Sequence, residues 1–142
     1  MANIRQKKYR LILNSKILTR KQRIDAFVKL GEYLRSAEMD HASILDTAVH
    51  KNAWYTKANI QQQIKAIAHN LTEEKLSKWL KDVPDTDQNK SVGLVLAGNL
   101  PLVGFHDIMC VLLAGFIAKI KVSSDDAGLT KFVLDKLIEI EP

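Results

Sequence analysis

The chain has 142 residues, of which 46% are hydrophobic and 26% charged, a composition that fits one soluble globular domain. Its single cysteine, Cys110, excludes an internal disulfide and a cysteine-rich zinc site, and its four histidines are scattered without a close metal-ligand pair. No apolar run approaches the ~18 residues of a membrane span or forms the core of a signal peptide. We therefore expect a cytoplasmic protein with no membrane span and no metal site.

The net charge of +5 is concentrated in an N-terminal arm. Residues 1–23 carry eight lysines and arginines and no acidic residue, whereas the rest of the chain has a net charge of −3. A basic arm can bind phosphates or RNA. No aromatic-rich surface accompanies these charges, so a solvated helix face is the simpler interpretation and no nucleic-acid partner is expected.

Four helices are predicted in the first part of the chain, each beginning at a side chain suited to cap a helix. These capping residues are Thr19, Asp40, Thr56 and Thr72. Gln22 completes a possible capping box for the first helix, over about residues 18–36. Apolar residues at helical spacing predict one buried stripe on each helix.

The second part of the chain has the pattern of a β-α-β-α unit. Apolar runs at residues 92–96 and 117–122 predict two strands, and the nearly uncharged segment at about 104–114 predicts a helix between them. Two strands joined in this way are expected to be parallel and buried on both faces. Residues 123–126 look like the start of the last helix, with several capping candidates.

The fold class is therefore α/β, with N-terminal helices followed by the start of a parallel nucleotide-binding sheet. We interpret the chain as one partial domain, made of a basic arm at 1–17, a helical part at 18–83, and the start of a cofactor-binding α/β part at 90–142. Two parallel strands make a poor sheet, and their open edges invite pairing. The protein thus looks truncated, and either a longer chain or self-association through the sheet edges would complete the sheet.

The turn after the first strand is the natural ligand site, because ligands in open α/β folds bind at the carboxyl ends of the strands. Gly98 allows a sharp turn or a close approach to a ligand, and Asn99 offers an amide donor for a developing oxyanion. Lys121, Ser123 and Ser124, after the second strand, could hold a ribose or phosphate, with backbone donors from the next helix. An ordinary turn and a solvated lysine are the competing interpretation.

A family resemblance appears in this same region. Gly98–Leu102, an apolar helix, Ala114-Gly115 and Ala118–Ser124 together resemble the aldehyde dehydrogenase superfamily. More narrowly, the first of these segments with Gly104–Asp107 is similar to the acyl-CoA reductases related to the fatty-acid reductase of bacterial luminescence. Asn52–Thr56 resembles another segment of that group, with alanine where proline is usual.

The resemblance implies an NADPH-dependent acyl-CoA reductase, an oxidoreductase that converts a fatty acyl-CoA thioester to an aldehyde. Asn99 would donate to the substrate's carbonyl oxygen, and Lys121 would contact the adenosine ribose or its phosphate. The other residues implied at the cofactor are Leu96, Ala97, Ser123 and Ser124. Ser124 stands where relatives that prefer NAD often have an acid, and the missing carboxylate favours NADPH over NADH.

The main departure from the superfamily is the catalytic cysteine, which lies in a second domain that this chain does not reach. Cys110 sits inside the apolar helix, where we expect it to be part of the core and not a nucleophile. The chain alone is thus expected to be an inactive N-terminal portion. Two alternatives stay open: a non-catalytic interaction domain that dimerises through its open sheet, and a nucleic-acid binder that uses the basic arm.

Three further side chains have open roles. His106 either satisfies the start of the apolar helix or lines an acyl or cofactor channel. Trp54 and Trp79 are expected to be core or interface residues, since large aromatic side chains dominate the energetics of both.

Overall fold

The computed structural model describes residues 17–85 and 89–142, so the basic arm, apart from its last residue, lies outside the described residues. The helical part comprises α2 (Arg20–Leu34), α3 (Ala37–Asp40), α4 (Ile44–Lys51), α5 (Lys57–Asn70) and α6 (Glu73–Leu80). The second part comprises β1 (Ser91–Val95), α7 (Phe105–Leu113), β2 (Ile117–Lys121), the 3-10 helix η1 (Ser124–Asp126) and α8 (Leu129–Ile140). The mixed α/β class is confirmed, whereas its aldehyde-dehydrogenase-like form stays a prediction.

Threonine side chains begin three of the helices, as the sequence predicts. Thr19 accepts a hydrogen bond from the Gln22 N–H at 3.2 Å, and the Gln22 side chain accepts one from the Thr19 N–H at 2.9 Å, which completes the capping box. Thr56 and Thr72 likewise accept from the N–H three residues later, at 3.1 and 3.4 Å. The prediction that Asp40 caps a helix is wrong, because it is the last residue of α3 and α4 begins at Ile44.

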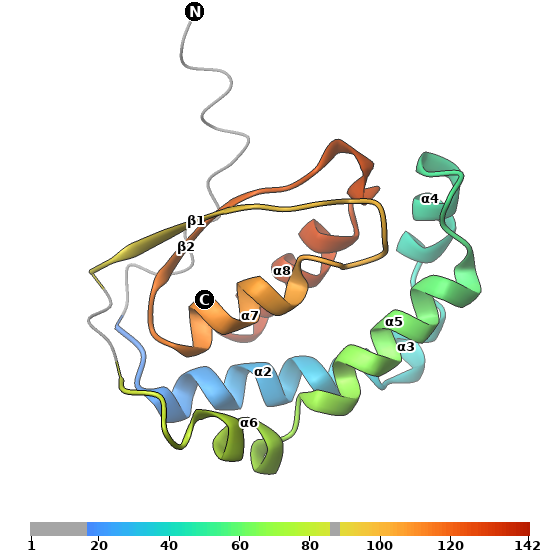
Figure 1. Ribbon diagram of the computed structural model, residues 1–142. Helices are drawn as coiled ribbons and strands as arrows, with labels where there is room; N and C mark the ends of the chain where they lie inside the picture. The colour runs from blue at the N-terminus through green and yellow to red at the C-terminus, as the bar shows by residue number, and fades with distance from the viewer. Residues whose placement is uncertain (1–16, 86–88) are drawn as a thin grey trace, which may run out of the picture.

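The two strands pair in parallel, in a register that runs from Ser91 opposite Ile117 to Val95 opposite Lys121. The expected burial on both faces is wrong. Ala118 and Ile120 are buried against the helices, whereas Val95 is 82% exposed and Lys121 also faces solvent. Figure 1 shows the reason: within the described chain, helices cover only one face of the sheet.

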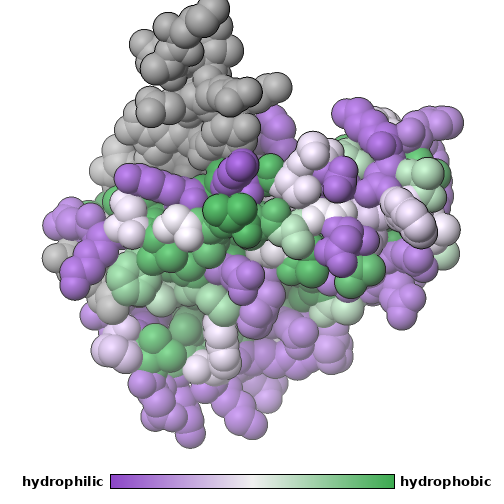
Figure 2. Space-filling model, turned by 45° about the horizontal axis from the view of Figure 1, so that its top comes forward, coloured by the Kyte–Doolittle hydropathy of each residue, from purple (hydrophilic) through white to green (hydrophobic). Residues whose placement is uncertain are grey.

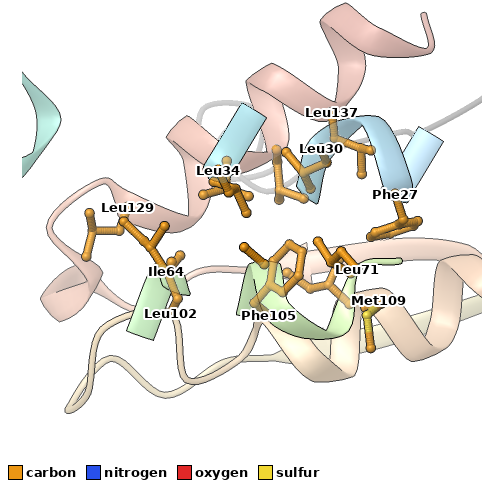
Figure 3. Packing of buried hydrophobic residues seen from close by; sticks show 14 of the residues in the cluster. Phe27, Leu30, Leu34, Ile64, Leu71, Leu102, Phe105, Met109, Leu129 and Leu137 are labelled. Carbon is orange, nitrogen blue, oxygen red and sulfur yellow. The ribbon is translucent and has the colours of Figure 1, made fainter. Parts of the chain in front are cut away.

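Helix α2 lies at the centre of the molecule (Figure 1) and contacts α5, α6, α7 and α8. Its apolar side chains meet those of α7, and the rings of Phe27 and Phe105 pack edge to face with centroids 6.3 Å apart (Figure 3). Leu30 and Leu34 extend this contact toward α5 and α8, and both are buried. The helical part and the α/β part therefore share one hydrophobic core.

A buried arginine ties the first helix to the second part of the chain. Arg23 donates to the carbonyl oxygens of Leu18 and Leu113, at 2.6 and 3.3 Å, and to the Asp85 carboxylate at 2.5 Å. The Arg23 side chain is only 7% exposed, whereas that of Asp85 is 52% exposed. The guanidinium thus satisfies two backbone acceptors inside the protein and one carboxylate at its surface.

Large hydrophobic side chains are also exposed. Figure 2, which brings the top of Figure 1 forward, shows a band of hydrophobic residues across this face with hydrophilic residues around it. Among the described residues, the most exposed large hydrophobic ones are Ile17, Trp54, Val95 and Leu100. Across residues 17–85 and 89–142, none of the helices combines the length and the apolar character needed to cross a membrane.

Candidate functional site

The turn after β1 runs from Leu96 to Pro101 and presents Ala97 and Asn99 to solvent. The Leu96 N–H donates to the carbonyl oxygen of Lys121 at 3.0 Å, which continues the pairing of the two strands by one residue. The Leu96 side chain is buried and fills the space beside Gly104 at the start of α7. Of the residues implied at the cofactor from this turn, Ala97 is accessible, whereas the side chain of Leu96 belongs to the core.

At Gly98 the turn after β1 packs against the segment that follows β2. A Cβ added to Gly98 would lie 2.8 Å from the backbone nitrogen of Asp126, and 2.8 Å from both Cβ and Oγ of Ser123. The sequence leaves open whether this glycine serves a sharp turn or a ligand. The close approach is to the protein itself, because the turn after β1 packs directly against the segment after β2.

The segment after β2 differs from its predicted form. Ser123 accepts a hydrogen bond from the Asp125 N–H at 3.2 Å and begins the short helix η1, so the last helix does not start here. The chain then passes through Ala127 and Gly128, which both have positive φ, at 57° and 87°. Helix α8 begins only at Leu129 because these two left-handed residues interrupt the helical path.

A buried carboxylate closes the start of α8. Asp126 accepts hydrogen bonds from the backbone N–H of Thr130 at 2.9 Å and from its hydroxyl at 2.5 Å. Burial raises the pKa of the Asp126 carboxyl, and these hydrogen bonds oppose the rise. The Thr130 N–H at the start of α8 is therefore bonded to Asp126 and not to a ligand. The expectation that the helix after β2 adds backbone donors for a phosphate stays a prediction.

Two residues of the α4–α5 connection hold both strand ends, a role that their sequence did not predict. Tyr55 is buried, and its hydroxyl donates to the Gly98 carbonyl oxygen at 2.6 Å. Burial, followed by the negative charges of Asp126 and Asp125, raises the pKa of Tyr55. The Asn52 amide donates to the Asp125 carbonyl oxygen at 2.8 Å. One short segment thus fixes the turn after β1 and the start of η1 together.

Most of the residues predicted to contact a ligand lie around this junction and are open to solvent, whereas Leu96 is buried. Asn99 is exposed on the turn after β1, Lys121 is exposed on the outer face of β2, and Ser124 is exposed at the start of η1. Ser123 is half-buried and already bonded within its own turn. The chain therefore brings an amide, an ammonium and a hydroxyl to the carboxyl ends of two parallel strands, where ligands of α/β proteins bind.

The two tryptophans and His106 lie at the surface of the molecule. Trp54 is 87% exposed, and Trp79 is 44% exposed with its ring 6.0 Å from the imidazole of His106. The core alternative for the tryptophans is therefore wrong, and the interface alternative stays a prediction. His106 lies on the surface of α7 beside α6, and the residue before α7 is Gly104, which has no capping side chain.

Cys110 does not resemble an activated nucleophile. Its side chain is only half-buried in α7, so it is not one of the buried core residues, as the sequence had predicted it to be. Burial, with a smaller contribution from the negative charge of Asp107, raises the pKa of the Cys110 thiol. A raised pKa disfavours the thiolate that attacks carbonyl carbons. In the part of the chain that the structure describes, no group of three or more His, Cys, Asp or Glu side chains could hold a metal ion.

Comparisons with protein-family models, with curated proteins and with solved structures found no match to this chain. The roles given to Asn99, Lys121 and Ser124 are therefore predictions from the residues and from the resemblance. What the structure adds is their common position at the strand ends and the hydrogen bonds of Asn52 and Tyr55 that fix it.

Proposed function

We propose that the chain is the nucleotide-binding portion of an NADPH-dependent acyl-CoA reductase, which converts a fatty acyl thioester to an aldehyde. The supporting observation is the junction of the two strand ends, where Tyr55 and Asn52 hold the turn after β1 against η1. Exposed polar side chains surround this junction, as a nucleotide that approaches from solvent requires.

Each residue has a distinct role in this proposal. Lys121 and Ser124 bind the adenosine ribose and its 2′-phosphate, because an ammonium attracts the phosphate and a hydroxyl does not repel it. The backbone at Ala97 lies beside the cofactor. The Asn99 amide donates to the carbonyl oxygen of the thioester as negative charge develops there. When bound, the cofactor supplies the hydride that reduces the acyl group.

The nucleophile in this proposal is a cysteine outside these 142 residues. Cys110 is not proposed for that role, because it is half-buried and its thiol pKa is raised. The chain alone should therefore bind NADPH without reducing acyl-CoA. Robust turnover by the 142-residue chain would contradict the proposed external cysteine.

Calorimetric titration of the chain with NADPH and NADH tests the cofactor site. We expect NADPH to bind more tightly, and Lys121→Met to weaken NADPH binding more than NADH binding. Lys119→Met is the matched control, because Lys119 is exposed on the same face of β2, two residues away. Equal losses in the two variants would indicate non-specific attraction to a basic surface, and no binding of either nucleotide would refute the proposal.

Serine 124 gives a separate test of cofactor choice. Ser124→Asp places a carboxylate where the 2′-phosphate is proposed, so repulsion should shift the preference toward NADH. Because Ser124 is exposed, the variant should fold as the wild type does. If the ratio of the NADPH and NADH affinities is unchanged in this variant, Ser124 is not part of the proposed site.

The second candidate is a non-catalytic interaction domain that dimerises through its open sheet. It is favoured by the uncovered outer face, where Val95 is 82% exposed. In that case the chain would bind neither nucleotide, and Val95→Lys would convert a dimer to a monomer in sedimentation experiments. A monomeric wild-type chain would contradict this candidate.

A further inference from the structure

An exposed indole is carried by the short segment that holds the junction of the strand ends. Trp54 is 87% exposed, twice the fraction of Trp79, whose ring contacts His106. Tryptophan is usually well buried, because its large apolar surface is costly to hydrate. An indole left in water on an ordered segment therefore suggests a surface that a ligand covers.

The backbone that carries this indole is held firmly. The Trp54 N–H donates to the Asn52 side-chain oxygen at 2.9 Å, and the Tyr55 N–H donates to the Asn52 carbonyl oxygen at 3.0 Å. The same Asn52 side chain donates to the Asp125 carbonyl oxygen at 2.8 Å. Figure 1 shows the end of α4 and the connection to α5 on the same side of the molecule as the strand ends.

We propose that Trp54 is the surface on which the purine ring of the nucleotide stacks. The inference rests on the function proposed above and adds the residue that recognises the base. A flat indole suits a planar heteroaromatic ring, and stacking of this kind tolerates an open, water-exposed position.

The position of Asn52 favours the purine over the nicotinamide ring. Asn52 connects the backbone of Trp54 to Asp125, the residue that directly follows Ser124. Ser124 is the proposed contact of the adenosine ribose, and the purine is the ring bonded to that ribose. A dinucleotide held at Ser124 by its adenosine ribose would therefore bring its adenine toward the segment of Trp54, and its nicotinamide would be the half directed toward Asn99.

Tryptophan fluorescence tests whether the purine contacts Trp54, once the signal of the other tryptophan, Trp79, is removed. Trp79→Phe leaves Trp54 as the only tryptophan of the chain, and its fluorescence is followed during titration with two halves of the cofactor. Adenosine 2′,5′-bisphosphate should quench the emission in a saturable way, whereas reduced nicotinamide mononucleotide should not. Unchanged emission, while calorimetry shows the bisphosphate bound, would overturn the stacking.

Affinity gives the second readout. Trp54→Ala should weaken binding of adenosine 2′,5′-bisphosphate by about fivefold to 150-fold, the range expected when a base loses its aromatic partner. Trp54→Phe should retain most of the affinity, and both variants should unfold at the wild-type temperature because the side chain is exposed. Equal affinity of Trp54→Ala and wild type would overturn the inference.

The outcomes separate this inference from the function on which it rests. If NADPH binds and Trp54→Ala binds it equally well, only the stacking is refuted. If neither NADPH nor the bisphosphate binds, both the function and the stacking are refuted. If Trp54→Ala changes the oligomeric state and leaves nucleotide affinity unchanged, the indole contacts a second copy and the inference is wrong.

Discussion

Replacing Gly98 with alanine is expected to force apart the two turns at the strand ends. The new Cβ would lie 2.8 Å from the Asp126 backbone nitrogen and 2.8 Å from Cβ and Oγ of Ser123. A backbone nitrogen and a Cβ cannot swing away as the end of a long side chain can, so one turn has to move. Overpacking of this kind costs about 1–3 kcal/mol of the free energy of unfolding.

Gly93→Ala is the matched control for this change. Gly93 lies on β1, and a Cβ added there meets nothing within 4 Å. Alanine reduces the backbone freedom of the unfolded chain, so the free energy of unfolding should stay the same or rise by up to about 1 kcal/mol. Urea unfolding followed by circular dichroism measures both variants. The urea midpoint of Gly98→Ala should lie below that of the wild type, and the midpoint of Gly93→Ala should equal or exceed it.

A third variant tests whether Ser123 is the obstacle. Ser123→Gly in the Gly98→Ala background removes two of the three close atoms and leaves the Asp126 nitrogen. We expect the double variant to regain part of the stability lost in Gly98→Ala. The double-mutant cycle should give a coupling energy between positions 98 and 123 of about 0.5–3 kcal/mol. The reasoning is refuted if Gly98→Ala unfolds at the wild-type urea concentration, or if Gly93→Ala loses as much stability.

Three further predictions, made with four substitutions, test the contacts around the junction and α2. Tyr55→Phe should lower the free energy of unfolding by about 1–3 kcal/mol, because the buried Gly98 carbonyl loses its donor; an unchanged thermal midpoint would contradict this. Burial raises the pKa of the Asp126 carboxyl, so the folded chain binds the carboxyl proton more tightly than the unfolded chain does. The stability of the wild type should therefore fall, relative to that of Asp126→Asn, as the pH rises from about 4 through the raised pKa. Urea midpoints measured across that range check it, and parallel curves for the two proteins would argue against it. Arg23→Met should lower the free energy of unfolding by about 1–3 kcal/mol, because two buried carbonyl oxygens lose their donor. Asp85→Asn should lower it less, because the Asp85 side chain is half exposed and its interactions are replaced by water. Equal losses of stability in urea unfolding would contradict that difference.

Local features of the fold were predictable because neighbouring residues determine them. Thr19 and Gln22 satisfy each other's backbone groups within one turn of helix, and the same short-range chemistry operates at Thr56 and Thr72. The parallel pairing of the strands followed from two apolar runs separated by a helix.

The features that could not be predicted depend on contacts between distant segments. Two neighbouring aromatic residues, Trp54 and Tyr55, have opposite burial, and nothing in their own sequence decides which one turns inward. Tyr55 turns inward because its hydroxyl donates to the Gly98 carbonyl oxygen at 2.6 Å, although 43 residues separate the two in the sequence. In the same way, Asp126 looked like part of a helix start until its bonds to Thr130 placed the true start three residues later.

The central position of α2 has a consequence for assembly of the chain. This helix contacts α5 and α6, which belong to the same helical part, and also α7 and α8, which come from the second part of the chain. Helix α2 covers part of the apolar surface of both α7 and α8, so residues 90–142 produced alone would expose hydrophobic side chains that α2 now contacts. The two halves, expressed as separate polypeptides, should therefore be insoluble or unfolded singly and should recover the fold by complementation when mixed.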